Sequence, residues 1–274
     1  MILKVVMLAL SISTALIADV DESYTRLTCK TKPCERACQR KIRLSNEMST
    51  STNASWCGYV AATNIARQTN YSVTKVVGSW IVPNINPSNV DTYCSMWVGI
   101  DGFGGPTVEQ IGTEHNYFRG QQMHYAWFEM YPEPSQQIMG FPVEVGDQIT
   151  ASVTYIPLNG VLPANSDLFI MQITNNTKRL YSIIPVITQS NMQRSCAEWV
   201  VEAPSLSTTL PLSNFGFASM FNCMAVINNV SGAINNPAWA NETVNMSTPE
   251  GIAKATASPL SPDGKGFSVV WKHN

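Results

Sequence analysis

The sequence predicts an all-β protein, built as an antiparallel sandwich or a barrel. From Ala54 onward, short runs rich in β-branched and aromatic residues are separated by Pro, Gly and Asn. This part of the chain has no long segment with the 3.6-residue apolar period of an amphipathic helix. At 274 residues, 45% of them hydrophobic and 13% charged, the chain can bury a large core, and its composition excludes a disordered protein, a coiled coil or a collagen-like fibre.

The candidate strands follow one another at regular spacing, with turn residues between them. This spacing is typical of antiparallel sandwiches and barrels. The clearest runs are residues 73–82, 95–100, 124–131, 147–156, 168–173, 196–202 and 266–271.

Three of these strands have two chemically different faces. Successive side chains of a strand point to opposite sides, so a two-residue period separates the faces. In the strands near residues 97, 127 and 199, one face is plainly apolar and the other mixes aromatic side chains with carboxylates. Because exposed Trp and Tyr waste apolar surface, the mixed face predicts either a lined groove or a surface covered by a loop or second layer. The alternation alone does not choose between them.

The N-terminal part of the chain differs from the rest in charge. Residues 1–18 have the basic start, apolar run and small residues of a secretory signal, and no other stretch is long enough to span a membrane. Residues 1–43 hold 8 of the 17 Lys and Arg but only 4 of the 19 Asp and Glu, so the remainder has a net charge of -6. We therefore expect a secreted protein in which residues 19–52 form a basic, cysteine-containing prosegment or extension with a linker, outside the core.

Export would place the cysteines in an oxidising compartment, where disulfides persist. Cys57, Cys94, Cys196 and Cys223 of the body allow two bridges in three connectivities. The sequence also carries six possible N-glycosylation acceptors, which predict exposed loops in a secreted chain. They are Asn53, Asn70, Asn175, Asn229, Asn241 and Asn245.

Several functions are disfavoured by motifs that the sequence lacks. The formal net charge of -2 gives no basic surface for nucleic acid. With three histidines and no His-Glu-x-x-His motif, a zinc peptidase is not expected, and no metal or other cofactor is predicted. The absence of a Gly-x-Ser-x-Gly elbow weakens the case for a serine hydrolase.

Seven short motifs, in this order along the body, resemble those of the glutamic peptidases, also called eqolisins. The resemblance runs from about Trp56 to the C-terminal strand. The motifs are Ser55-Trp56-Cys57-Gly58, Gly78-Ser79-Trp80-Ile81-Val82-Pro83, Trp97-Val98-Gly99-Ile100-Asp101-Gly102, Glu109-Gln110-Ile111-Gly112, Ala126-Trp127-Phe128-Glu129-Met130-Tyr131-Pro132, Cys196-Ala197-Glu198-Trp199-Val200-Val201-Glu202 and Asn214-Phe215-Gly216.

The resemblance implies a fold, an activity and a set of site residues. It implies a concanavalin-like sandwich of two bent antiparallel sheets over residues 53–274, acting as a monomeric secreted acid endopeptidase on polypeptide substrates. Gln110 and Glu198 correspond to the catalytic pair, whereas Glu109 points to the other face and is expected to be a bystander. The residues that the resemblance places around the substrate cleft are Trp56, Trp97, Asp101, Trp127, Glu129 and Tyr131.

The sequence also departs from the family pattern in two places. The family usually has Asp where this chain has Tyr125, and a loop cysteine where it has Gly104 and Gly105. Cys196, whose usual partner is that loop cysteine, would then pair elsewhere, with Cys94 or Cys223.

Three other functions stay open at this point. The aromatic face could bind sugar rings, as in a lectin of the legume type. A glycosidase could use Glu129 and Glu198 as its two carboxylates, and this would leave Gln110 without a necessary role. The chain could also be a family member that has kept the fold and lost activity.

Overall fold

The computed structural model describes residues 23–34, 51–157, 166–188, 192–206 and 208–273, and these fold as an all-β protein. The described residues contain no helix that could cross a membrane. Every predicted strand is confirmed, with small shifts at the ends. The strands are β1 (Thr25–Arg26), β2 (Lys30–Pro33), β3 (Ser51–Asn53), β4 (Trp56–Ala62), β5 (Val73–Ile81), β6 (Ser95–Ile100), β7 (Val108–Phe118), β8 (Gln121–Tyr131), β9 (Gln136–Met139), β10 (Gln148–Ile156), β11 (Asp167–Asn175), β12 (Leu180–Thr188), β13 (Cys196–Glu202), β14 (Phe217–Ile227), β15 (Val230–Ala233), β16 (Ala240–Ser247), β17 (Ala253–Ala257) and β18 (Phe267–Trp271).

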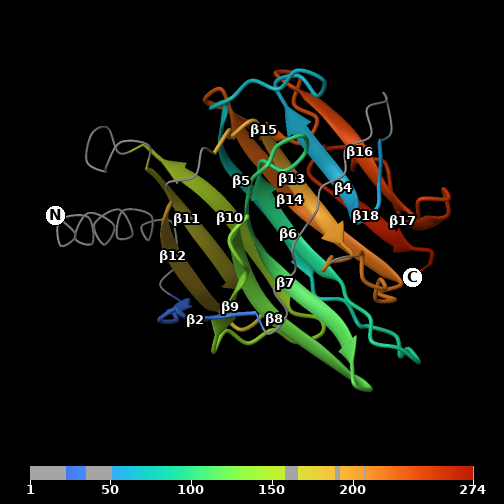
Figure 1. The fold of residues 1–274 in the computed structure, drawn as a ribbon. Coiled ribbons are helices and arrows are strands. Elements are labelled where there is room, and N and C mark those ends of the chain that lie inside the picture. Colours follow the sequence, from blue (N-terminus) through green and yellow to red (C-terminus); the bar gives the residue numbers. More distant parts are fainter. Residues whose placement is uncertain (1–22, 35–50, 158–165, 189–191, 207, 274) are drawn as a thin grey trace.

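The strands pair as one continuous, open network (Figure 1). Its order is β1-β12-β11-β10-β5-β14-β18-β17-β16-β4-β13-β6-β7-β8-β9-β2, with β15 beside β14 and β3 beside β16. All pairs are antiparallel except β1 with β12 and β3 with β16. The expected separation into two sheets is therefore not seen, because β17 and β18 carry the hydrogen bonding from one half to the other.

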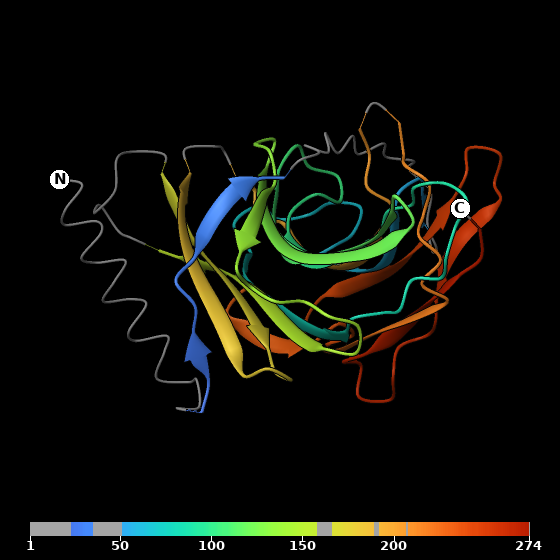
Figure 2. The same ribbon diagram turned by 90° about the horizontal axis from the view of Figure 1, so that it is seen from below.

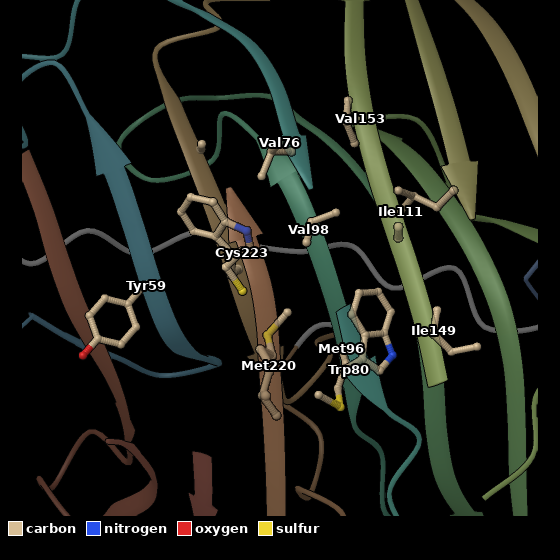
Figure 3. Packing of buried hydrophobic residues seen from close by; sticks show 14 of the residues in the cluster. Tyr59, Val76, Trp80, Met96, Val98, Ile111, Ile149, Val153, Met220 and Cys223 are labelled. Atoms are coloured by element: carbon tan, nitrogen blue, oxygen red, sulfur yellow. The ribbon is translucent and has the colours of Figure 1, made fainter. Parts of the chain in front are cut away.

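The network curls back on itself, so that β5 and β10 pack against β6 and β7. The main core fills the space between these layers (Figure 3). Val76, Val98, Ile111, Val153 and Met220 come from five different strands and are all at most 1% exposed. Burying each such side chain contributes about 1.5–3 kcal/mol, so this layer stabilises the fold substantially.

The β7–β8 hairpin is the longest feature of the sheet that carries the site. Each strand has eleven residues, and the two-residue turn at Arg119 and Gly120 has φ values of 50° and 79°. Such a turn matches the right-handed twist of the strands that it joins. Figure 2 shows how strongly this bright green hairpin bends. The bend gives the site-bearing face a concave shape.

Part of the N-terminal segment belongs to the fold, contrary to the expectation of a leader outside the core. β1 and β2 pair with β12 and β9, and Leu27 and Cys29 pack against the main core. Cys34 is buried. The expected signal over residues 1–18 and residues 35–50 of the expected prosegment lie outside the described residues.

The expected disulfides of the body are not formed. Cys57, Cys94, Cys196 and Cys223 are separate buried thiols. Cys196 lies in the cluster on the concave face, whereas Cys94 and Cys223 lie in the main core, so neither expected partner is on its side of the sheet. The expected pairing of Cys196 with Cys94 or Cys223 is therefore wrong.

One of the six glycosylation acceptors is unsuitable in this fold. Asn175 is fully buried, and its amide nitrogen donates to Asp147 Oδ2 at 2.7 Å and to the Pro142 carbonyl at 3.1 Å. Its side-chain oxygen accepts from the Lys178 amide at 3.0 Å. Asn70, Asn229 and Asn241 are exposed, as the prediction requires.

Candidate active site

The predicted division of the strands into two faces is confirmed by the packing. The apolar face of β6, β7, β8 and β13 forms part of the main core, and the mixed face forms a second cluster. Trp56, Trp97 and Trp127 lie together in this second cluster. Both faces are buried in the structure, since every residue of β6 and β13 is buried. The faces therefore differ in chemistry and not in exposure.

Gln110 and Glu198 flank one glycine of the central strand β6. Gly99 pairs with Gln110 of β7 on one side and with Glu198 of β13 on the other. The two backbones are thus two strand spacings apart, about 10 Å, and both side chains rise from the mixed face. A Cβ at Gly99 would lie 3.3 Å from Gln110 Cβ and 2.9 Å from the Trp97 ring. The missing side chain at Gly99 therefore makes room for the Trp97 ring and for Gln110 over this part of β6.

Glu129 holds the amide of Gln110. The two residues are opposite each other in the β7–β8 pair, and Gln110 Nε2 donates to Glu129 Oε2 at 2.5 Å. Both side chains are at most 1% exposed. This bond fixes the orientation of the Gln110 amide in the row that contains Gly99 and Glu198.

The two oxygens of Glu198 have different surroundings. Oε1 accepts the Phe103 amide N–H at 2.6 Å and the Cys196 thiol at 3.4 Å. Oε2 is buried and accepts no hydrogen bond from the described residues. Burial raises the pKa of Glu198 well above its ordinary value, although the Phe103 N–H, which favours the carboxylate, opposes this. One oxygen is therefore anchored and the other is available for a ligand.

A hydrogen-bonded brace holds the loop that carries Phe103. Gln68 Nε2 donates to the Phe103 carbonyl at 2.7 Å, and Gln68 Oε1 lies 2.7 Å from the Ser195 hydroxyl. The Asp101 carboxylate accepts the Arg194 amide at 2.6 Å and the Ser195 amide at 2.7 Å. The brace therefore joins Gln68, the loop of residues 101–103 and residues 194–195. The last of these segments leads directly into β13, which bears Glu198.

Asp101, which the resemblance places around the cleft, holds the segment that precedes β13. It is 1% exposed, and its carboxylate accepts the backbone N–H groups of Arg194 and Ser195. Asp101 lies just beyond β6 with a φ of 64°, so the two-residue period of that strand does not position its side chain.

The close fit around Glu198 requires glycine at position 102. Gly102 has a φ of 115°, in the region that favours glycine. A Cβ there would lie 2.7 Å from the Trp56 ring, 2.8 Å from Val108 and 3.1 Å from Glu198 Oε2. The loop backbone at Gly102 thus lies close to Glu198 Oε2, and only glycine leaves room for this approach.

The predicted aromatic residues meet on the same face. Trp56 and Trp97 make an edge-to-face contact, with ring centroids 5.0 Å apart and planes at 77°. Trp97 Nε1 donates to Glu202 Oε2 at 2.7 Å. Tyr131 packs against the cluster from its edge. Glu202 is not among the predicted site residues, although the two-residue period of β13 places it on the face of Glu198.

A cavity of about 370 Å³ opens at one end of this face. Its lining includes Glu114, Tyr125 and Trp127 of the β7–β8 hairpin and Lys32 and Cys34 of the N-terminal segment. Tyr125 stands where the resembled family has Asp. No sequence pattern connects Lys32 and Cys34 with this place, because their proximity depends on the pairing of β2 with β9.

Glu109 points to the other face, as predicted. It is fully buried, and burial raises its pKa well above the ordinary value. Its neighbour in the strand, Gln110, faces the candidate site, so the two adjacent residues have separate environments. In the described residues, no group of three or more His, Cys, Asp or Glu side chains is arranged to hold a metal ion.

Comparison with known proteins places these features in a wider context. The model of the Peptidase A4 family matches residues 54–262. Scytalido-glutamic peptidase, solved with a transition-state analogue inhibitor, is 17% identical, with a TM-score of 0.64 over 80% of this chain and 98% of that one. SCP-B, a member of the eqolisin family solved with the tripeptide Ala-Ile-His, is 16% identical over the same shares, with a TM-score of 0.60.

A further similar structure is the aspergilloglutamic peptidase from Aspergillus niger. It is 21% identical, with a TM-score of 0.52 over 66% of this chain and 99% of that one. At these identities the likeness to solved structures is a likeness of fold. A comparison with curated proteins gives no match.

Proposed function

The chain belongs to the Peptidase A4 family, and we propose that it is a secreted acid endopeptidase in which Glu198 and Gln110 activate the attacking water. The observation that carries this proposal is the placement of the two side chains on either side of Gly99, with Glu198 Oε2 left without a hydrogen bond in the described structure. A water held between this oxygen and the Gln110 amide would lie over β6, beside the Trp97 ring.

Amide hydrolysis at this site needs a base, a donor for the oxyanion and an acid. Glu198, as carboxylate, takes a proton from the water as its oxygen attacks the peptide carbonyl. The Gln110 NH₂ group donates to the oxyanion that forms, a contribution of about 3–4 kcal/mol in comparable sites. Glu198 then returns the proton to the departing amine nitrogen, and the C–N bond breaks. The carboxyl is regenerated without a covalent intermediate.

The environment of Glu198 suits this double role. The Phe103 N–H fixes Oε1 and so directs Oε2 toward the water. The raised pKa makes the carboxylate a stronger base than an ordinary glutamate, and the protonated form persists to a higher pH. Catalysis at acid pH uses the fraction of Glu198 that is ionised there, and the Phe103 N–H favours this carboxylate form.

The buried carboxyl groups favour stability of the folded protein at acid pH. Burial raises the pKa of Asp101, Glu109 and Glu198, so the folded state binds these protons more readily than the unfolded state. Their contribution to stability is complete below the ordinary carboxyl pKa and is lost as the pH rises through the raised values. His115 and His124 act in the opposite sense, because burial lowers both pKa values.

Secretion and activation complete the proposal. We assign residues 1–18 to a secretory signal, and to the basic residues between Cys34 and Ser51 an inhibitory role before the chain is cut there. The net charge of -6 outside residues 1–43 supports an electrostatic attraction between the two parts. The substrates are polypeptides.

The test is hydrolysis of a denatured protein between pH 2 and 7 by the full chain after acid incubation. Wild type should cleave, chelators and reagents for serine or cysteine nucleophiles should have no effect, and Gln110→Ala should lose activity. A protein that cleaves nothing at any pH is a degenerate family member. If Gln110→Ala is fully active, the pair is wrong, and cleavage of a glycan by that variant would favour the glycosidase scheme.

A further inference from the structure

The strand network has two free ends, and the N-terminal segment occupies both. Residues 23–34, which we call the clasp, form β1 at the end next to β12 and β2 at the end next to β9. Figure 2 shows both blue strands along one side of the molecule. Without the clasp, the backbone groups of β12 and β9 on that side would have no strand to pair with. Unpaired strand edges of this kind can pair with other chains and lead to aggregation.

Backbone hydrogen bonds hold the clasp in its two strands and at its end. Thr25 donates to the Arg179 carbonyl at 2.7 Å, and Leu27 donates to the Tyr181 carbonyl at 2.8 Å. β2 then pairs with β9 over its four residues. Cys34 donates to the Ser135 carbonyl at 3.0 Å. This is strand addition to a sheet edge, performed twice by a segment of twelve residues.

Side chains of the clasp also enter the body. Leu27 and Cys29 pack against the main core, and burial raises the pKa of the Cys29 thiol. The Tyr24 hydroxyl donates to Asn176 Oδ1 at 3.3 Å. Cys34 is 9% exposed and belongs to the cluster that contains the site tryptophans. The clasp is therefore held to the body by side-chain packing as well as by backbone pairing.

The clasp reaches the candidate active site as well. Lys32 and Cys34 line the 370 Å³ cavity together with Glu114, Tyr125 and Trp127. Removing the clasp would therefore open this end of the concave face, and any substrate that extends past Trp127 would meet a different wall.

We propose that the clasp is a permanent part of the folded protein and stays bound, as a second short chain, when the polypeptide is cut between Cys34 and Ser51. Residues 23–34 then belong to the mature protein, so the removable leader ends before residue 23 and not at residue 52. The proposal rests on strand pairing and packing alone, so it does not depend on the catalytic roles given to Gln110 and Glu198.

The first experiment cuts the full chain at one engineered place. A recognition sequence for a site-specific protease is introduced between residues 35 and 50, and the cut protein is passed through gel filtration and then measured by denaturing mass spectrometry. We expect the N-terminal fragment to co-elute with the body, one for one. A fragment that separates from the body under native conditions would overturn the proposal.

A second experiment needs no cut and uses a matched pair of variants. Leu27→Pro removes the N–H that donates to the Tyr181 carbonyl. Arg26→Pro is the control, because the N–H of Arg26 points away from β12 in the parallel pairing and makes no bond to it. We expect Leu27→Pro to lower the melting temperature by roughly 5–10 °C and to release the fragment after cutting. Arg26→Pro should do neither. Equal melting temperatures for Leu27→Pro and wild type would contradict a structural clasp.

Discussion

Glu109 and Glu198 are both fully buried glutamates on strands that flank β6, yet they lie on opposite faces of the same sheet. Burial raises the pKa of both well above the ordinary value. Glu198 shares its face with an amide partner and receives the N–H of Phe103, whereas Glu109 lies on the face of the main core. A raised pKa therefore does not identify a catalytic carboxyl. What identifies the catalytic carboxyl is the face of the strand on which it lies and the presence of Gln110 on the other side of Gly99.

The largest expected effect separates these two glutamates directly. Glu198→Gln keeps the shape of the side chain but removes the group that takes and returns the proton, so kcat/KM should fall roughly 10³–10⁴-fold. Glu109→Gln is the matched control and should retain most of the activity. Steady-state kinetics on a denatured protein substrate measure both. Equal losses in the two variants would show that both glutamates act through the fold and not through chemistry.

A second substitution tests the tight approach of the loop to Glu198. Gly102→Ala places a Cβ against Trp56 and near Glu198 Oε2, so kcat/KM should fall about 100-fold through misplacement of the carboxyl. Gly104→Ala is the control, since φ there is 93° but the nearest atom to a new Cβ is 3.7 Å away. If both variants lose the same activity, backbone strain and not the contact with the site is the cause.

A smaller effect is expected from the brace behind Glu198. Gln68→Ala frees the Phe103 carbonyl, loosens the loop and weakens the N–H bond that favours the Glu198 carboxylate. The pKa of Glu198 should then rise further, and the acid limb of the pH profile of kcat/KM should move to higher pH. Arg67→Ala, at an exposed neighbouring position, is the control. A profile that only drops in height, without moving, would contradict this role for Gln68.

The smallest expected effect concerns stability at the core-facing glutamate. Because burial raises the folded-state pKa of Glu109, ionisation of its carboxyl opposes folding at neutral pH. Glu109→Gln should therefore raise the melting temperature at pH 7, by about 2–4 °C for each kcal/mol regained. The gain should disappear below the ordinary glutamate pKa, where the carboxyl is protonated in both states. Melting curves at pH 3.5 and pH 7 measure this, and a gain of the same size at both values would rule out a titration effect.

The sequence was sufficient to predict those features that depend on the two-residue period within a single strand. It predicted the strands, the two faces and the separation of Gln110 from Glu109, because alternation fixes these locally. It did not predict the hydrogen-bond partners of Asp101, because a positive φ ends the period there and the partners come from residues 194 and 195.

Long-range pairing explains the other failures. The place of Cys196 relative to Cys94 depends on which layer each strand faces. The role of residues 23–34 depends on which edges of the network stay open. Neither property is encoded in the spacing of residues along the chain.

The most direct test of the shared water is the double variant Gln110→Ala/Glu198→Gln, compared with each single variant. If the two side chains act as one unit, kcat/KM of the double variant should stay within about 3-fold of that of Glu198→Gln alone, since residues of one catalytic unit have strongly non-additive effects. If the losses of the two single variants multiply in the double variant, the two side chains act independently, and the proposed joint activation of water is contradicted.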